Sequence, residues 1–303
     1  MIPADAAYEG EPRWRRRRRL LRQRKIPVRF LVPNFFTLLS LCAGVTAIRM
    51  AVEHRYEFAV ALIVAAALLD GVDGRLARAL KAQSRFGAEL DSLADFVNFG
   101  VAPGIVIFNW TLDGNRGFSW IAVLAFACGM GLRLARFNSM LEVDKPKWQS
   151  NFFTGMPAPA GAVTVLLPLY LEGVGLTGIR SLPLVTSLYT LVLAGLLVST
   201  LPTFSGKLIG ERIGREWVLP ILVGAALVVG LLVTYPYPTL TVFTLFYLAM
   251  VPVSYRRFRI KKSQWDLDNP VDHTTATPTA TGEPPSAPPI SHLRSISPGD
   301  TKH

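Results

Sequence analysis

Two pairs of aspartates stand close together in the sequence, Asp70 with Asp73 and Asp91 with Asp95. Residues three or four apart share one face of a helix, so each pair would present its carboxylates together. The connector between the pairs is short enough for the two helices to be antiparallel neighbours, which would bring both pairs to one place. Carboxylate oxygens with no His or Cys nearby suit hard divalent cations such as Mg2+ or Mn2+. The spacing therefore indicates a site in which two such ions could promote phosphoryl transfer.

These aspartates lie where one apolar run ends and the next begins. A carboxylate at the centre of a membrane span costs about 2.5–3.5 kcal/mol, and four together also repel one another, which protonation or bound cations would relieve. One such residue alone could join two helices or belong to an ion pathway, so an ion-coupled transporter is an alternative. Transporters often consist of two related halves, whereas this sequence holds a single copy of the aspartate pattern, which favours an enzyme.

The aspartates belong to a chain built of long apolar runs. Of its 303 residues 50% are hydrophobic, and the runs of about 17 to 25 residues have the length that crosses a bilayer core of about 30 Å. The rhythm of short strands and amphipathic helices expected of a soluble α/β protein is not found. We predict an all-α polytopic membrane protein with spans at about 31–52, 56–77, 91–110, 118–138, 157–174, 182–201, 217–235 and 238–254.

The formal charge of +11 could indicate either nucleic acid or a membrane surface as a partner. Basic residues gather at the ends of the apolar runs and in both tails, which favours a membrane with anionic headgroups and argues against nucleic acid. If the N-terminus is cytoplasmic, eight spans return the C-terminus to the same side. The opposite side then carries only Arg49, Arg55, Arg116 and Arg180. We therefore predict that both termini and the aspartates face the cytoplasm.

The chain divides into three parts by composition. Residues 1–30 form a basic cytoplasmic segment, which either serves topology alone or forms an interfacial helix; a cleaved export signal is disfavoured, since no convincing cleavage site follows it. Residues 31–255 form the membrane catalytic domain. Residues 256–303 begin basic and then become rich in Pro, Ser and Thr, with few groups to bury, so we predict a disordered cytoplasmic tail.

Residues 70–95 resemble, at every fixed position, the pattern D-x2-D-G-x2-A-R-x8-G-x3-D-x3-D of the CDP-alcohol phosphotransferase family. The resemblance implies an enzyme in which an alcohol attacks a CDP-linked donor and CMP is released. It also implies a six-helix membrane core, here with about two further spans, a homodimer, and a site that opens to the cytoplasm. By the same resemblance, two divalent ions are held by Asp70, Asp73, Asp91 and Asp95, and Asp95 is also the base on the acceptor hydroxyl.

The resemblance further assigns contacts with the donor to Asn34, Gly74, Ala77, Arg78, Ser84 and Gly87. Elementary chemistry agrees for several of these positions. Glycine lets the backbone approach a bulky nucleotide closely. The planar fork of an arginine suits diphosphate oxygens. The motif supplies no obvious nucleophile besides its carboxylates, so direct displacement is favoured over a covalent intermediate.

Three further segments, residues 33–37, 132–138 and 153–160, resemble the bacterial phosphatidylserine synthase branch of that family. This resemblance implies CDP-diacylglycerol as donor and L-serine as acceptor, giving phosphatidylserine and CMP at the inner membrane of a bacterium. Glycerol phosphate, inositol phosphate and choline are alternative acceptors within the family. The carboxylate of serine would be met by Arg133 and Arg136, with Asn138 as a hydrogen-bonding partner, although both arginines could instead anchor their span in the headgroups.

Overall fold

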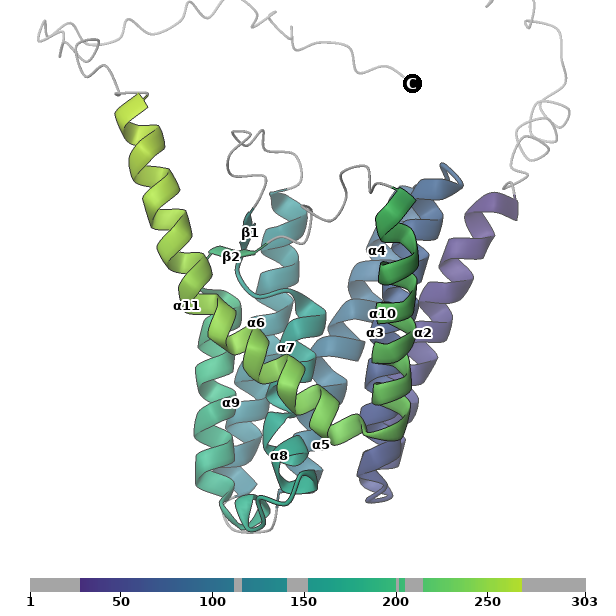
Figure 1. Cartoon of the computed structure of the whole chain (residues 1–303). Coiled ribbons are helices and arrows are strands. Elements are labelled where there is room, and N and C mark those ends of the chain that lie inside the picture. Colours follow the sequence, from purple (N-terminus) through teal and green to yellow (C-terminus); the bar gives the residue numbers. More distant parts are fainter. Residues whose placement is uncertain (1–27, 112–115, 141–151, 200–201, 205–214, 269–303) are drawn as a thin grey trace, which may run out of the picture. The chain divides into compact units, whose positions relative to one another are not determined.

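The structure is a computed structural model, which describes residues 28–111, 116–140, 152–199, 202–204 and 215–268. The chain divides into two compact units, residues 1–261 and 262–303, and the elements described below lie in the first, except for the end of α11. Figure 1 labels the principal ones. In chain order they are α2 (Val28–Val52), α3 (Tyr56–Ala79), α4 (Arg85–Asp95), η2 (Phe96–Val101), α5 (Ala102–Trp110), α6 (Arg116–Ser139), β1 (Phe152–Thr154), α7 (Ala158–Val165), α8 (Leu167–Gly173), η4 (Ile179–Ser181), α9 (Pro183–Val198), β2 (Pro202–Phe204), α10 (Arg215–Thr234) and α11 (Pro236–Asp268).

Tight turns reverse the chain between α2, α3 and α4. Each turn contains a residue with left-handed backbone, His54 (φ 58°) after α2 and Lys81 (φ 48°) after α3. After α3, the N–H of Ala82 donates to the carbonyl of Ala77 at 2.9 Å, which satisfies an end carbonyl in the manner of a Schellman motif. Both α3 and α4 pack against α2. The turns therefore bring the last turns of α3 and of α4, which carry the aspartates, close to each other.

The second aspartate pair lies directly before an irregularity in its helix. Residues Arg85–Trp110 form one continuous helix, but its middle part, η2, is wound as a π-helix that starts immediately after Asp95. Within η2, Asn98 is buried and donates through Nδ2 to Ser40 Oγ of α2 at 2.8 Å, and Ser40 donates to the carbonyl of Ala66 in α3 at 2.9 Å. Such π segments often occur at functional sites. This one fixes the rotation of α4 against α2 and α3.

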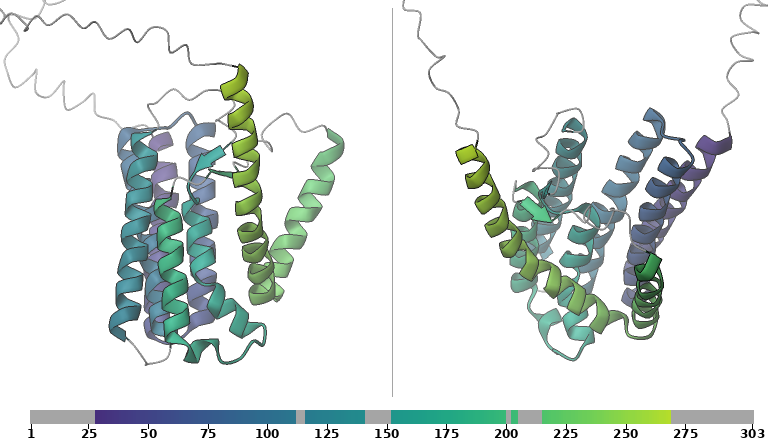
Figure 2. Two further views of the ribbon diagram at one scale, coloured as in Figure 1. Left: turned by 90° about the vertical axis from the view of Figure 1, so that its left-hand side faces the viewer. Right: turned by 45° about the horizontal axis from the view of Figure 1, so that its top comes forward.

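The other half of the bundle is built on α6 and α9, which lie side by side (Figure 2). At Gly129 an added Cβ would lie 3.1 Å from the carbonyl oxygen of Ala194, so the absent side chain permits close helix approach. The predicted span 157–174 is broken into α7 and α8, and Pro168 stands in the first turn of α8, where its missing N–H is tolerated. The large, fully buried side chains of the bundle include Phe126, Met130, Met156 and Tyr170.

The remaining elements are a short ribbon and the last two long helices. Strand β1 pairs antiparallel with β2, Phe153 opposite Thr203, and so ties the segment before α7 to the segment after α9. Helices α10 and α11 meet at one end (Figure 2). No part of the apolar window of α10 is buried against the rest of the described chain. Helix α11 continues beyond the predicted end of the last span at 254, through the basic run, to Asp268.

The prediction of an all-α polytopic membrane protein is confirmed. Within the described residues, five helices are long and apolar enough to cross a membrane: Leu31–Val52, Arg85–Trp110, Arg116–Ser139, Glu216–Thr234 and Pro236–Lys261. The other three predicted spans fall on α3, on α7 with α8, and on α9. Most of the basic N-terminal segment and of the predicted tail lie outside the described residues.

The close approach of α2 to η2 predicts that Gly44→Ala is destabilising. The added Cβ would overlap the side-chain oxygen of Asn98, and overpacking a well-filled core costs about 1–3 kcal/mol. We expect a lower midpoint of thermal unfolding for the purified protein in detergent. Gly195→Ala in α9 is the control, since its Cβ would meet no atom within 4 Å and alanine is the better helix former. Equal midpoints for the two variants would contradict the packing described here.

Candidate active site

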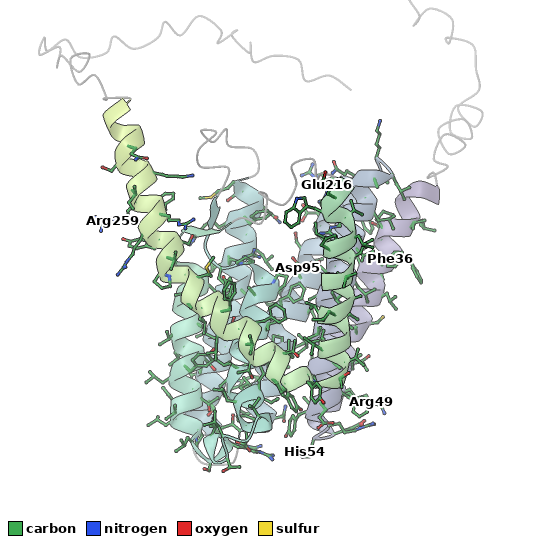
Figure 3. The ribbon with its side chains drawn as sticks, viewed as in Figure 1. Phe36, Arg49, His54, Asp95, Glu216 and Arg259 are labelled. Carbon is green, nitrogen blue, oxygen red and sulfur yellow. The ribbon has the colours of Figure 1, made fainter. Side chains whose placement is uncertain are left out.

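Three carboxylates converge between α3 and α4. Asp70, Asp91 and Asp95 each offer one oxygen, and these oxygens all lie within 4.8 Å of one another. Figure 3 shows Asp95 within the bundle, nearer to the end that carries Glu216 than to the end that carries His54. Oxygens at this separation repel one another unless protons or a cation lie between them, and a cluster of carboxylates is the ligand set of a hard divalent ion. The arrangement could hold a metal ion.

One side-chain oxygen of Asp95 lacks a hydrogen-bond partner among the described residues. Its Oδ1 atom is buried and accepts no hydrogen bond from any described residue. A buried carboxylate oxygen without a partner is costly, and coordination of a cation removes that cost. The donor set and the orphaned oxygen therefore both fit a divalent metal at this position.

The fourth aspartate has a different environment. Asp73 is 3% exposed and is not part of the three-oxygen group. Its Oδ2 accepts a hydrogen bond from Thr37 Oγ1 of α2 at 2.8 Å. The Oδ2 atom of Asp73 thus joins α3 to α2. The predicted role of Asp73 as one of the four metal ligands therefore depends on its other carboxylate oxygen, Oδ1.

A pocket of about 560 Å³ lies beside the acidic cluster. Its wall includes Asp73 and Asp91, so the pocket and the cluster share a boundary. Every residue that the sequence assigned to the donor lines it, from three different elements and the turn between α3 and α4. They are Asn34, Gly74, Ala77, Arg78, Ser84 and Gly87. The volume lies within the range of small-molecule and cofactor sites.

Local structure explains several residues of this wall. Ser84 is the N-cap of α4, and its Oγ accepts from the N–H of Gly87 at 3.0 Å. An added Cβ at Gly87 would lie 2.9 Å from Asn34 Oδ1, so glycine permits α4 to approach α2. At Gly74 the nearest atom to an added Cβ is Arg78 Nη1 at 3.7 Å. This is an ordinary van der Waals distance, so the packing of the chain itself does not require glycine at position 74.

The three residues predicted to contact the acceptor are placed differently from one another. Arg133 is part-buried, its charge acts on both Asp70 and Asp95, and its Nε donates to the carbonyl of Met156 at 2.9 Å. Arg136 donates through Nη1 to the carbonyl of Val198 at 2.7 Å, at the C-terminus of α9.

Asn138 is exposed and donates through Nδ2 to Ser92 Oγ of α4 at 2.9 Å. By these contacts, Arg133 is the member of the predicted set whose charge reaches the acidic cluster, whereas Arg136 and Asn138 also hold α6 against its neighbours.

Sequence reasoning missed some contributors to the site. Thr37, which bonds Asp73, and Phe137, which lines the pocket, carried no assigned role. A signal existed for Thr37, because it stands three residues after Asn34 and so shares a face of α2 with it. The π-helix after Asp95 has no comparable signal in the sequence.

Comparisons with known proteins identify the relatives of this chain. The family pattern described as CDP-alcohol phosphatidyltransferase matches residues 30–201, and that of CDP-alcohol phosphatidyltransferase 2 matches residues 216–252. The CDP-diacylglycerol–serine O-phosphatidyltransferase of Mycobacterium bovis is 38% identical over 241 residues, 79% of this chain and 82% of that protein. Its namesake from Mycobacterium leprae is 53% identical over 137 residues, 45% of each chain.

A more distant relative is the archaetidylserine synthase of Methanothermobacter thermautotrophicus, 32% identical over 156 residues, which are 51% of this chain and 64% of that protein. The first family pattern covers more than half of the chain and includes all four aspartates. The resemblance seen in the sequence is thus confirmed: the chain belongs to the CDP-alcohol phosphatidyltransferase family.

Proposed function

We propose that the chain transfers the phosphatidyl group of CDP-diacylglycerol to the hydroxyl of L-serine, giving phosphatidylserine and CMP. The observation that carries this proposal is the shared boundary of the acidic cluster and the pocket lined by all six predicted donor contacts. The names of relatives with 38% and 53% identity support serine as the acceptor. Glycerol phosphate, inositol phosphate and choline are the acceptors that an assay must exclude.

In the proposed reaction, Asp70, Asp91 and Asp95 hold a divalent ion, Mg2+ or Mn2+, and Asp73 contributes to a second. The bound ions supply neutralisation of the charge that gathers on the diphosphate. Arg78 offers its guanidinium to the same diphosphate from the pocket wall. The serine hydroxyl oxygen forms a new bond to the phosphatidyl phosphorus as the bond to CMP breaks, and Asp95 accepts the hydroxyl proton during that step.

For the acceptor, we propose that Arg133 meets the carboxylate of serine beside the acidic cluster. Arg136 and Asn138 complete the contact in the sequence-based prediction. Because Arg136 Nη1 already donates to Val198 and Asn138 already donates to Ser92, only their remaining donor groups are available for serine.

The cellular arrangement is part of the proposal. The enzyme is multi-pass in the inner membrane of a bacterium, with both termini and the active site on the cytoplasmic side, as the distribution of basic residues predicts. Anionic headgroups would attract the basic N-terminal segment. The family resemblance suggests a homodimer.

The role of Asp95 predicts a severe loss of activity in Asp95→Asn. Purified protein with CDP-diacylglycerol, labelled L-serine and Mg2+ or Mn2+ should release CMP and form labelled phosphatidylserine. Removal of the metal ligand and proton acceptor should lower kcat by about 100-fold or more. Glu89→Gln removes an exposed carboxylate from the same helix and serves as control. Comparable activity of the two variants would contradict the assignment, and efficient use of another alcohol by the wild type would contradict serine.

The acidic cluster predicts direct binding of Mn2+, measured by electron paramagnetic resonance in the absence of either substrate. Asp91→Asn should weaken this binding about tenfold or more, since even partners of metal ligands change affinity by that amount. Chelation by EDTA should abolish CMP release, and added Mg2+ or Mn2+ should restore it. Binding of Mn2+ that is equally strong in Asp91→Asn would show that the cluster is not the metal site.

The position of Arg133 predicts a selective effect on the acceptor. Arg133→Ala should raise the KM for serine about tenfold or more, because a hydrogen bond to a charged group is lost, while the KM for CDP-diacylglycerol changes little. Arg136→Ala tests the second arginine. Loss of its bond to the end of α9 should lower the thermal midpoint, and loss of its proposed contact with serine should also raise the KM for serine. An equal rise of both Michaelis constants in Arg133→Ala would contradict acceptor binding.

A further inference from the structure

A tyrosine of α11 stands out among the buried polar groups that the metal and the donor pocket leave unexplained. The hydroxyl of Tyr247 is buried and makes no hydrogen bond to any described residue. The rest of its side chain packs against the hydrophobic core of the bundle. A buried hydroxyl without a partner is unfavourable, so Tyr247 is expected to bond a group other than the described residues.

The neighbour that defines this location is Arg133 of α6. Its charge acts on the hydroxyl of Tyr247 and on the carboxylates of Asp95 and Asp70. The Nε atom of Arg133 donates to the carbonyl of Met156 at 2.9 Å, which fixes the guanidinium, and none of the side-chain bonds of the described residues involves its terminal N–H groups. Two unpartnered buried atoms, Asp95 Oδ1 and Tyr247 OH, thus lie in the electrostatic neighbourhood of one arginine.

These three groups match the acceptor of the proposed reaction. An amino acid with a hydroxyl side chain presents a proton to be accepted and a carboxylate to be bound. Asp95 is an acceptor, Arg133 is a cation with parallel donors, and Tyr247 is a neutral donor. A carboxylate has two oxygens with several acceptor positions, so it can take an arginine and a phenol at once.

We propose that Tyr247 donates a hydrogen bond to the carboxylate of the acceptor serine, and that α11 thereby contributes to selection of the acceptor. The inference rests on the proposed function and extends it, since Tyr247 lies outside the aspartate motif and outside the three segments that suggested serine. Acceptors without this carboxylate gain nothing from Tyr247.

The test is the conservative variant Tyr247→Phe, which removes one oxygen and keeps the packing of the ring. We expect the KM for serine to rise about tenfold, as for loss of a hydrogen bond to a charged group, with the KM for CDP-diacylglycerol and the affinity for Mn2+ unchanged. The matched control is Tyr170→Phe in α8. The hydroxyl of Tyr170 is also buried and unpartnered among the described residues, but its ring stacks on Tyr237, which lines a separate pocket with His54.

A second measurement separates carboxylate binding from a general disturbance of the site. L-Alanine has the amino group and carboxylate of serine without the hydroxyl, and ethanolamine has the amino group and hydroxyl without the carboxylate. As competitive inhibitors against serine, alanine should lose affinity in Tyr247→Phe, whereas ethanolamine should not.

An unchanged KM for serine in Tyr247→Phe, or equal weakening of both inhibitors, would overturn the inference while the proposed function stands. The inference also fails if Tyr247→Phe lowers only the thermal midpoint, since the hydroxyl would then be structural. A wild-type enzyme that releases CMP with another alcohol and not with serine would instead reject the proposed function, and with it the role of Tyr247.

Discussion

Carboxylates crowded together inside an apolar bundle repel one another, and each has lost much of the hydration that stabilises its charge in water. The structure nonetheless brings Asp70, Asp91 and Asp95 within a distance that one cation can bridge. Such an arrangement persists only if the surrounding helices are held firmly enough to resist the repulsion. Much of the fold around this point can be understood as the framework that resists it.

Two kinds of contact provide that framework. The turn at Lys81 returns the chain from α3 to α4 through backbone hydrogen bonds, so the two aspartate-bearing segments stay adjacent. Buried side-chain bonds then connect both segments to α2, through Thr37 to Asp73 and through Ser40 to Asn98. Buried donors that are satisfied in this way specify one arrangement of helices, because any other leaves them without partners.

The same helices bring groups with different chemistry to the site. The pocket between α2, α3 and α4 presents glycines, a serine cap and Arg78, and suits a nucleotide diphosphate. Arg133 comes from α6, is fixed by the segment that precedes α7, and carries a charge that acts on Asp70 and Asp95 of the acidic cluster. The acidic cluster therefore borders the pocket proposed for the donor and interacts with the arginine proposed for the acceptor, as a transfer between two substrates requires.

The sequence by itself determined the class of fold, the aspartates and the family, because each depends on local information. The lengths of apolar runs follow from bilayer thickness, and the spacing of Asp70, Asp73, Asp91 and Asp95 follows from helical periodicity. The tertiary structure decided which side chains from different helices meet, which the spacing of residues in the sequence does not predict. It placed Asp73 against Thr37 rather than within the three-oxygen group, directed Arg136 to the end of α9, and brought Tyr247 from the last described helix toward Arg133. These outcomes depend on which helix faces lie opposite each other, and that is settled by packing among residues far apart in the chain, such as Gly44 against Asn98.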